Sequence, residues 1–186
     1  LLDIIFASLV LIITSPVIGI VALLIKITSQ GPVFFKQERM GMDGKIFNML
    51  KFRTMFINAE QETGPVWTKK GDPRCTKTGK FLRRTSIDEL PQFINVLRGD
   101  MSIVGPRPER PVFIQNFRNT IPKYMLRHKM KAGITGWAQV SGWRGNTSLE
   151  KRIEYDLYYI ENWTLNFDLK IIWLTLWNGF VNKHAY

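Results

Sequence analysis

The chain is organised around one stretch, RRTSIDELPQFINVLRGDMSIVGPRPE, at residues 83–109. Near its middle stand two acids side by side, Asp88 and Glu89, and no other two acids in the sequence are adjacent. Arg83 precedes them, and a Gly-Pro-Arg-Pro turn that carries Arg107 follows them. One carboxylate is suited to attack phosphorus, its neighbour to hold a hard metal ion, and the arginines to grip phosphate oxygens.

A plain structural role competes for the two acids, because apolar residues between 90 and 97 recur at helical spacing. Ser86 and Glu89 have the spacing of a capping box, but that register makes the ring of Pro91 strike a helical carbonyl. With Asp88 as the N-cap, Pro91 falls in the first turn, where proline is tolerated. Capping is the commoner role for an isolated Asp-Glu pair. A helix N-terminus also favours phosphate beside an ionised carboxylate, so both roles stay open.

Composition bounds the class of protein. With 186 residues the chain suits one domain, and because it begins with Leu we expect it to be part of a longer protein. Its net charge of +11 predicts polyanionic partners such as lipid headgroups or phosphorylated substrates. The single cysteine, Cys75, excludes an internal disulfide and favours a reducing compartment. Two histidines are too few for a usual zinc site, so any metal should take oxygen ligands, Mg²⁺ first.

The N-terminal run from Ile4 to Ile25 carries no charge and predicts a membrane helix. A straight helix of this length crosses the roughly 30 Å hydrocarbon core of a bilayer. Ser15 and Pro16 interrupt the run, and a proline there removes a helical hydrogen bond and bends the segment. A strongly bent helix can enter and leave by the same face, although composition alone favours spanning. Basic residues downstream predict a cytoplasmic location for the rest of the chain.

Two segments, Val33–Met40 and Lys45–Arg53, flank Asp43-Gly44 and predict a β-hairpin. Lys51 and Arg53 share one face of the second strand, where surface solvation and phosphate binding are equally good explanations.

Three features of the C-terminal half have plain structural explanations. The basic run at residues 127–131 predicts a solvated face or a contact with lipid headgroups, and Asp156 predicts a surface acid. Residues 163–186 are rich in tryptophan and too short in apolar length to span a bilayer, which predicts an interfacial helix or a core helix. Asp168 near its start is by default a helix cap.

The central stretch is similar to the signature of the bacterial sugar transferases, the monotopic phosphoglycosyl transferases. Three more stretches match the same family: KFRTM at residues 51–55, GITGWAQVSG at 133–142 and NWTLNFDLKI at 162–171. The resemblance runs along essentially the whole chain, and a motif as long as the central one is highly specific. The final Ala185-Tyr186 resembles the end of the large members of the family.

The resemblance implies a reaction: transfer of a hexose-1-phosphate from a UDP-sugar to polyprenyl (undecaprenyl) phosphate, with release of UMP. Residues 141–146 resemble members that use UDP-glucose, which favours glucose-1-phosphate by analogy. This step would begin exopolysaccharide, capsule or O-antigen synthesis at the cytoplasmic face of the bacterial inner membrane. Asp88 would form a covalent aspartyl-phosphosugar intermediate, and Glu89 would bind Mg²⁺. The residues expected to bind substrate or phosphate are Lys51, Arg83, Arg107, Gln139 and Asp168.

The resemblance also implies a fold, a mainly helical α+β structure. Residues 1–28 would form a broken, re-entrant membrane helix and residues 29–186 a catalytic domain on the cytoplasmic face, with a small hairpin and interfacial amphipathic helices around a membrane-surface site. Membrane lipids are expected partners, nucleic acid is not, and a homo-oligomer is left open. Two alternatives remain: a non-catalytic, basic, membrane-anchored binding module, and a membrane phosphohydrolase that uses the same acids.

Overall fold

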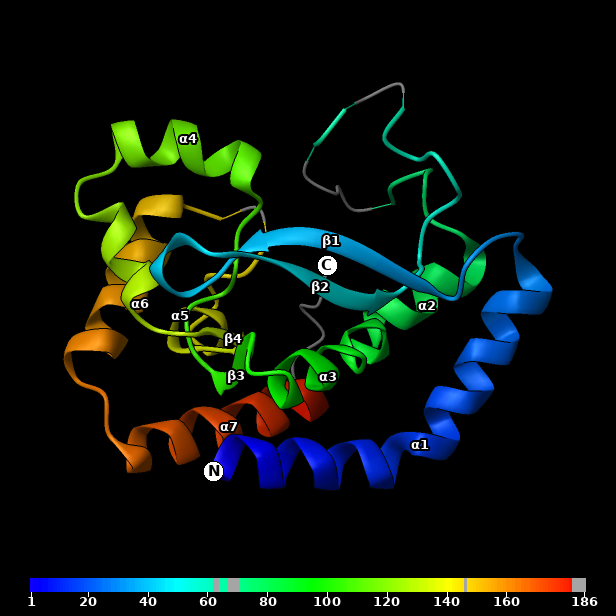
Figure 1. Ribbon diagram of the computed structural model, residues 1–186, viewed down its shortest axis with the longest axis horizontal. Coiled ribbons are helices and arrows are strands. Elements are labelled where there is room, and N and C mark those ends of the chain that lie inside the picture. Colours follow the sequence, from blue (N-terminus) through cyan, green and yellow to red (C-terminus); the bar gives the residue numbers. More distant parts are fainter. Residues whose placement is uncertain (62–63, 67–70, 146, 182–186) are drawn as a thin grey trace.

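The computed structural model describes residues 1–61, 64–66, 71–145 and 147–181. Within them the chain is mainly helical, with two pairs of short strands, and this confirms the α+β class (Figure 1). The helices are α1 (Leu2–Thr28), α2 (Lys77–Arg84), α3 (Gln92–Leu97), α4 (Pro111–Thr120), α5 (Trp137–Val140), α6 (Leu149–Glu161) and α7 (Leu165–Val181). The strands are β1 (Phe34–Met40), β2 (Ile46–Phe52), β3 (Met101–Val104) and β4 (Ala132–Thr135). Three 3₁₀ turns are η1 (Met42–Gly44), η2 (Ile87–Glu89) and η3 (Tyr124–Lys129).

Strands β1 and β2 form the predicted antiparallel hairpin. The chain reverses through Asp43 and Gly44, both with positive φ, which is the conformation that an Asp-Gly turn adopts most readily. Phe34 lies opposite Phe52, and their rings stack with centroids 5.4 Å apart. The hairpin thus holds Lys51, one residue before Phe52, at a fixed place on its second strand.

The second pair, β3 and β4, is parallel, and β3 is followed directly by the Gly-Pro-Arg-Pro turn. Its two chains continue to bond beyond the strands, because the N–H of Gly105 donates to Thr135 (2.9 Å) and the N–H of Gly133 donates to Pro106 (3.0 Å). The backbones approach so closely that a Cβ on Gly133 would lie 2.1 Å from the Gly105 nitrogen. Glycine is therefore needed here for the close approach.

Gly133→Ala is expected to destabilise the protein by roughly 3 kcal/mol or more, because the added methyl meets backbone that cannot move without separating β3 from β4. Thermal unfolding measures the change. Gly19→Ala is the matched control, since a Cβ at Gly19 meets nothing within 4 Å. Equal stability of the two variants would contradict the tight packing at Gly133.

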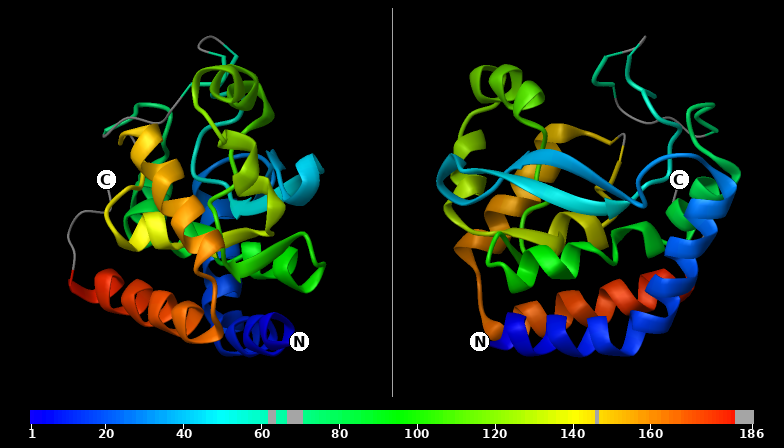
Figure 2. Two further views of the ribbon diagram at one scale, coloured as in Figure 1. Left: turned by 90° about the vertical axis from the view of Figure 1, so that its left-hand side faces the viewer. Right: turned by 45° about the vertical axis from the view of Figure 1, so that its right-hand side comes forward.

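Helix α1 is long and apolar enough to cross a membrane by length and composition. It changes direction along its length, and Pro16 lies inside it, which supplies the physical reason for a bend (Figures 1 and 2). Ala7, Val21 and Ile25 are buried and join two clusters of the core. Most of its large side chains are exposed: Ile4, Ile5, Leu9, Ile12, Ile13, Ile20, Leu23, Leu24 and Ile27. Exposed apolar surface of this extent is typical of membrane contact, while the re-entrant path stays a prediction.

Arg53 anchors the end of α1 to the hairpin. Its guanidinium donates to the carbonyl of Ser29 (2.9 Å) and to the Ser29 hydroxyl (2.9 Å), and also to the carbonyl of Gln30. Arg53 is therefore buried as a cap on the chain that leaves α1. Neither surface solvation nor phosphate binding, the two sequence-based explanations, describes it.

Helix α7 lies beside the N-terminal half of α1, and both views show the two helices along the same side of the molecule (Figures 1 and 2). Ile171 of α7 and Ala7 of α1 belong to one buried cluster. The outer side chains of α7 stay exposed: Leu169, Trp173, Leu176 and Trp177. Such a tryptophan-rich face suits a membrane interface, and its location there stays a prediction. Residues 182–186 of the predicted C-terminal segment lie outside the described part of the chain.

Candidate active site

The two adjacent acids lie in η2, between α2 and α3, and neither caps a helix. Ser86, before η2, has a left-handed backbone with φ 56° and makes no capping hydrogen bond with its side chain. Helix α3 begins only after Pro91, at Gln92. The predicted Asp88 cap is therefore wrong, because the chain forms a separate 3₁₀ turn and α3 begins only after Pro91. The capping-box register, which Pro91 already disfavoured, is not adopted either. The carboxylates are thereby left for other contacts.

The carboxylate of Glu89 lies among three cations. Lys51 Nζ is 2.9 Å from Oε1, and Arg107 contacts both oxygens, with Nη2 at 2.5 Å and Nη1 at 3.4 Å. Arg144 Nη2 approaches Oε2 at 3.7 Å. Arg107 also donates to Gln139 Oε1 at 3.0 Å. The structure therefore brings together four of the predicted residues, which come from β2, η2, the turn after β3, and α5.

Asp88 is also buried, at 7% exposure, but its carboxylate forms no hydrogen bond or ion pair with the described residues. Arg83, on the neighbouring α2, donates its Nε to Thr54 Oγ1 at 2.8 Å. Within the described part of the chain this is the one side-chain hydrogen bond of Arg83, so its two terminal nitrogens are suited to an incoming anion. The site thus contains one carboxylate that is tightly paired and one that is not.

Electrostatics separates the two acids further. Burial, and next the charge of Glu89, raise the pKa of Asp88 to about 6, against the pull of the surrounding cations. Burial opposes ionisation of Glu89 as well, but Arg107, Lys51 and Arg144 hold its pKa well below the usual value. Glu89 is therefore ionised at neutral pH and well into the acid range, while Asp88 changes charge just below neutral pH. Such a split between neighbouring carboxyls is frequent in active sites.

Asp168, also a predicted site residue, forms its hydrogen bonds away from Glu89. Its carboxylate accepts from Tyr159 Oη (2.7 Å) and from Trp163 Nε1 (3.1 Å). These bonds tie the end of α6 to the start of α7. The predicted cap role of Asp168 is wrong, because α7 begins at Leu165 and the hydroxyl of Thr164 accepts from the N–H of Phe167 at 3.1 Å. The bonds of Asp168 do not connect it to Glu89.

Arg144 is the site residue that sequence reasoning missed. It lies in the short loop between α5 and α6, directly before Gly145 and two residues after Gly142, and both glycines have positive φ. A glycine-rich loop that carries one arginine was the available signal, but it does not show which anion the arginine faces. Arg144 and Glu89 are 55 residues apart in the sequence, so their contact can be seen only in the folded structure.

Two adjacent buried acids, with several arginines and a lysine around them, are typical of sites that handle anionic phosphate esters. The chain belongs to the bacterial sugar transferase family, whose model matches residues 1–182.

Curated relatives agree with this family. A UDP-glucose:undecaprenyl-phosphate glucose-1-phosphate transferase of Escherichia coli strain K12 is 54% identical over 188 residues, covering 99% of this chain and 40% of that protein. A UDP-N-acetylgalactosamine-undecaprenyl-phosphate N-acetylgalactosaminephosphotransferase of Aeromonas hydrophila is 45% identical, covering 94% of this chain and 42% of that protein. A relative from Caulobacter vibrioides, named like the first, is 42% identical and is covered to 70% of its length. The chain spans less than half the length of the first two.

Proposed function

We propose that this chain transfers a hexose-1-phosphate, in the first place glucose-1-phosphate, from a UDP-sugar to undecaprenyl phosphate and releases UMP. The observation that carries the proposal is the unpaired, buried carboxylate of Asp88 beside a cation-bound Glu89, within a chain of this family. The names of the relatives supply the donor and the acceptor. Glucose has priority because the relatives from Escherichia coli and Caulobacter vibrioides are both named for it.

The chemistry follows from the two acids. The ionised Asp88 attacks the β-phosphorus of the UDP-sugar, the bond from that phosphorus to the bridging oxygen breaks, and UMP leaves with the oxygen. A phosphate oxygen of undecaprenyl phosphate then attacks the same phosphorus and displaces the Asp88 carboxylate. Splitting the transfer in two lets a soluble donor and a lipid acceptor use one site in turn. Each step exchanges one high-energy phosphate linkage for another.

The cations stabilise the charge of the diphosphate. The terminal nitrogens of Arg83 suit the phosphate oxygens of the donor, because a planar guanidinium matches them two at a time. Lys51 and Arg107 are held in place by Glu89. They place positive charge near Asp88 and form their ion pairs with Glu89. Phosphoryl transfer depends mainly on positioning and on charge stabilisation of this kind. Gln139 orients Arg107 through its amide oxygen.

The donor set also fits Mg²⁺. Within the described residues no three of His, Cys, Asp or Glu gather into a metal cluster. Mg²⁺ usually takes one or two carboxylates and completes its shell with substrate phosphate and water, and Asp88 and Glu89 supply that number. Glu89 is the residue that would hold the ion, in exchange for one of its contacts with Lys51, Arg107 or Arg144. The ion would neutralise charge on the diphosphate when bound.

The apolar surfaces suggest where the reaction takes place. In the proposal, residues 1–28 form a re-entrant anchor and residues 29–186 a catalytic domain on the cytoplasmic face of the bacterial inner membrane. The outward face of α7 lies in the interface, beside lipid headgroups. This arrangement would bring the phosphate of undecaprenyl phosphate to the height of Asp88. The product would start exopolysaccharide, capsule or O-antigen synthesis.

The test is the covalent intermediate itself. Purified protein incubated with UDP-glucose and Mg²⁺, without lipid acceptor, is expected to release UMP and to gain the mass of one hexose phosphate. Peptide mapping should place that mass on Asp88, and undecaprenyl phosphate should remove it and yield a lipid-linked sugar. UDP-N-acetylgalactosamine, the donor in the name of one relative, is the comparison substrate.

Three results would refute the proposal. Free hexose phosphate in place of a lipid product would favour the phosphohydrolase. Lipid binding without release of UMP would favour the basic binding module. An adduct on any residue except Asp88 would overturn the assignment of the nucleophile.

A further inference from the structure

The turn that carries Arg107 is held in place by hydrogen bonds to its backbone carbonyls. Four consecutive carbonyls, from Pro106 to Glu109, each accept a hydrogen bond from a different donor, at 2.9–3.0 Å. The donors, in chain order, are the N–H of Gly133, the guanidinium of Arg127, the guanidinium of Arg39 and the N–H of Met40. The bond to the carbonyl of Arg107 itself comes from a side chain, so a side chain controls where this residue stands.

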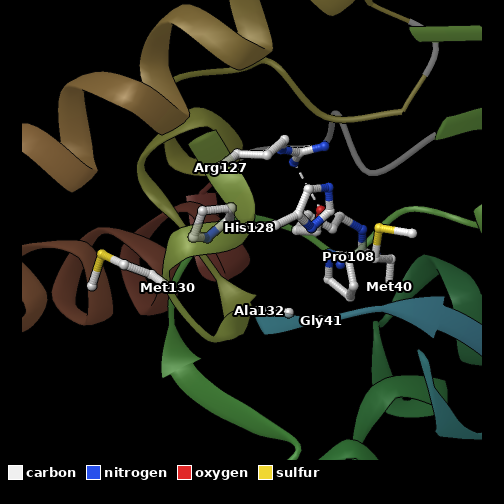
Figure 3. Close-up of a pocket in the computed structure, with 9 residues that line it drawn as sticks. Met40, Gly41, Pro108, Arg127, His128, Met130 and Ala132 are labelled. Carbon is white, nitrogen blue, oxygen red and sulfur yellow. Dashed lines mark hydrogen bonds between the residues drawn. The ribbon is translucent and has the colours of Figure 1, made fainter. Parts of the chain in front are cut away.

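That side chain, Arg127, is 2% exposed and is paired with Asp156 of α6, which is equally buried, at 2.6 Å. The same Nη2 that donates to Asp156 also donates to the Arg107 carbonyl, at 2.9 Å. Figure 3 labels Arg127 among the residues that line the cavity beneath the turn. The predictions of a solvated face or a headgroup contact for the basic run, and of a surface position for Asp156, are therefore wrong at Arg127 and Asp156. The cavity beneath the turn measures only about 10 Å³, so it is too small for a sugar nucleotide.

A second buried ion pair, between Arg152 of α6 and Glu109, supports the loop that carries Arg144. Arg152, 4% exposed, donates to Glu109 Oε1 at 2.8 Å and to the carbonyl of Gly145 at 2.5 Å. Gly145 follows Arg144 directly, so this bond fixes the loop that brings Arg144 to Glu89. Arg152 and Asp156 stand four residues apart and thus on one face of the helix.

We propose that Arg152 and Asp156 of α6, with Arg127 and Glu109, are positioning residues that set the places of Arg107 and Arg144 around Glu89. The proposal rests on the proposed function, since it explains how the phosphate-binding cations are held. Burying two ion pairs is a poor way to gain stability, because desolvation offsets much of their attraction. In each pair the arginine also donates to a backbone carbonyl at the site. Arg127 donates to the carbonyl of Arg107, and Arg152 donates to the carbonyl of Gly145, which follows Arg144.

The test separates position from stability with two variants of one pair. In Arg127→Met/Asp156→Leu the buried charges are replaced together by apolar groups, which a core tolerates well. The melting temperature is expected to stay near wild type, while kcat for UMP release falls about a hundredfold, the size of effect that a shift of about 1 Å in a catalytic group produces. KM for the UDP-sugar should change far less than kcat.

Asp156→Asn is the conservative variant. Its amide oxygen still accepts from Arg127 and keeps that side chain on the Arg107 carbonyl, so kcat should remain within about tenfold of wild type. Its melting temperature should fall, because the charge of Arg127 loses its counter-ion. Glu154→Gln, on the same helix in an exposed pair with Lys151, is the control and should change neither quantity. Activity that follows melting temperature across this series overturns the proposal.

Two further measurements keep the result decisive. If the double variant does not fold, Arg127→Lys replaces it, since an ammonium can pair with Asp156 but is too short to reach the Arg107 carbonyl as well; a folded Arg127→Lys protein with wild-type kcat overturns the proposal. The crystal structure of the folded variant should show Arg107 withdrawn from Glu89. An unchanged contact refutes the positioning role whatever the reaction, whereas a wild-type protein that releases no UMP refutes the proposed function alone.

Discussion

Asp88→Asn is expected to lower the rate of UMP release by about ten-thousandfold or more, the scale seen when a nucleophile is removed. The amide keeps the size and the burial of the side chain, so donor binding should survive while no hexose phosphate adduct forms. Donor binding is measured by calorimetry and release of UMP by a continuous assay. Turnover within tenfold of wild type would show that another group attacks phosphorus.

The same variant should be more stable than wild type at neutral pH. Burial and Glu89 raise the pKa of Asp88 from 3.8 to about 6, so the ionised carboxylate is unfavourable in the folded state. The penalty is absent below the unfolded pKa, grows as pH rises, and is complete above about 6, where two pKa units correspond to about 3 kcal/mol. Denaturant unfolding should therefore show Asp88→Asn gaining stability at pH 8 and little at pH 4. A loss at pH 8 would contradict the unpaired, buried carboxylate.

In the wild-type enzyme the same ionisation should appear in the rate. Because attack requires the carboxylate, kcat/KM is expected to rise with pH through about 6 and to level off above it.

The hairpin followed from local sequence, whereas the site residues were named mainly through the family resemblance. Asp43-Gly44 between two alternating segments predicted the turn, because few other residue pairs accept positive φ there. The grouping of Lys51, Arg107 and Gln139 with Glu89 is an outcome of the fold, while the roles that the family resemblance implied for them stay predictions. The type of a site residue and the motif around it can be recognised from the sequence, even when the residues that it contacts are distant along the chain.

The buried ion pairs could not be predicted in this way. Arg127 stands in a basic run that has the composition of a solvated face, and Asp156 lies between residues that give no sign of burial. They meet across 29 residues of sequence, and only the packing of α6 against η3 removes both from water. Charge patterns in one segment cannot show a partner in another. For the same reason Arg53 was placed with Lys51, although it caps α1.

Glu89→Gln is expected to have the opposite effect on stability from its neighbour. The carboxylate neutralises Lys51, Arg107 and Arg144, and removing one member of a buried ion pair costs about 3–5 kcal/mol. The pKa of Glu89 is held well below 4.5, so its stabilisation is present above the unfolded pKa and disappears as pH falls through the folded one. The loss in Glu89→Gln should accordingly be large at pH 7 and small in acid, where wild type loses the same charge.

Catalysis should fail in the same variant for a related reason. Without the anion, Arg107 and Lys51 lose the contact that holds them at the site, and a loss of about a hundred- to a thousandfold in kcat is the size expected for a disturbed charge clamp. Removing Glu89's charge also lowers the pKa of Asp88, so the acid limb of the remaining activity should move to lower pH. The changes in stability of Asp88→Asn and Glu89→Gln should be compared with each other. Opposite stability changes at pH 7 support one tightly paired and one unpaired acid, and changes of the same sign would contradict the site as described.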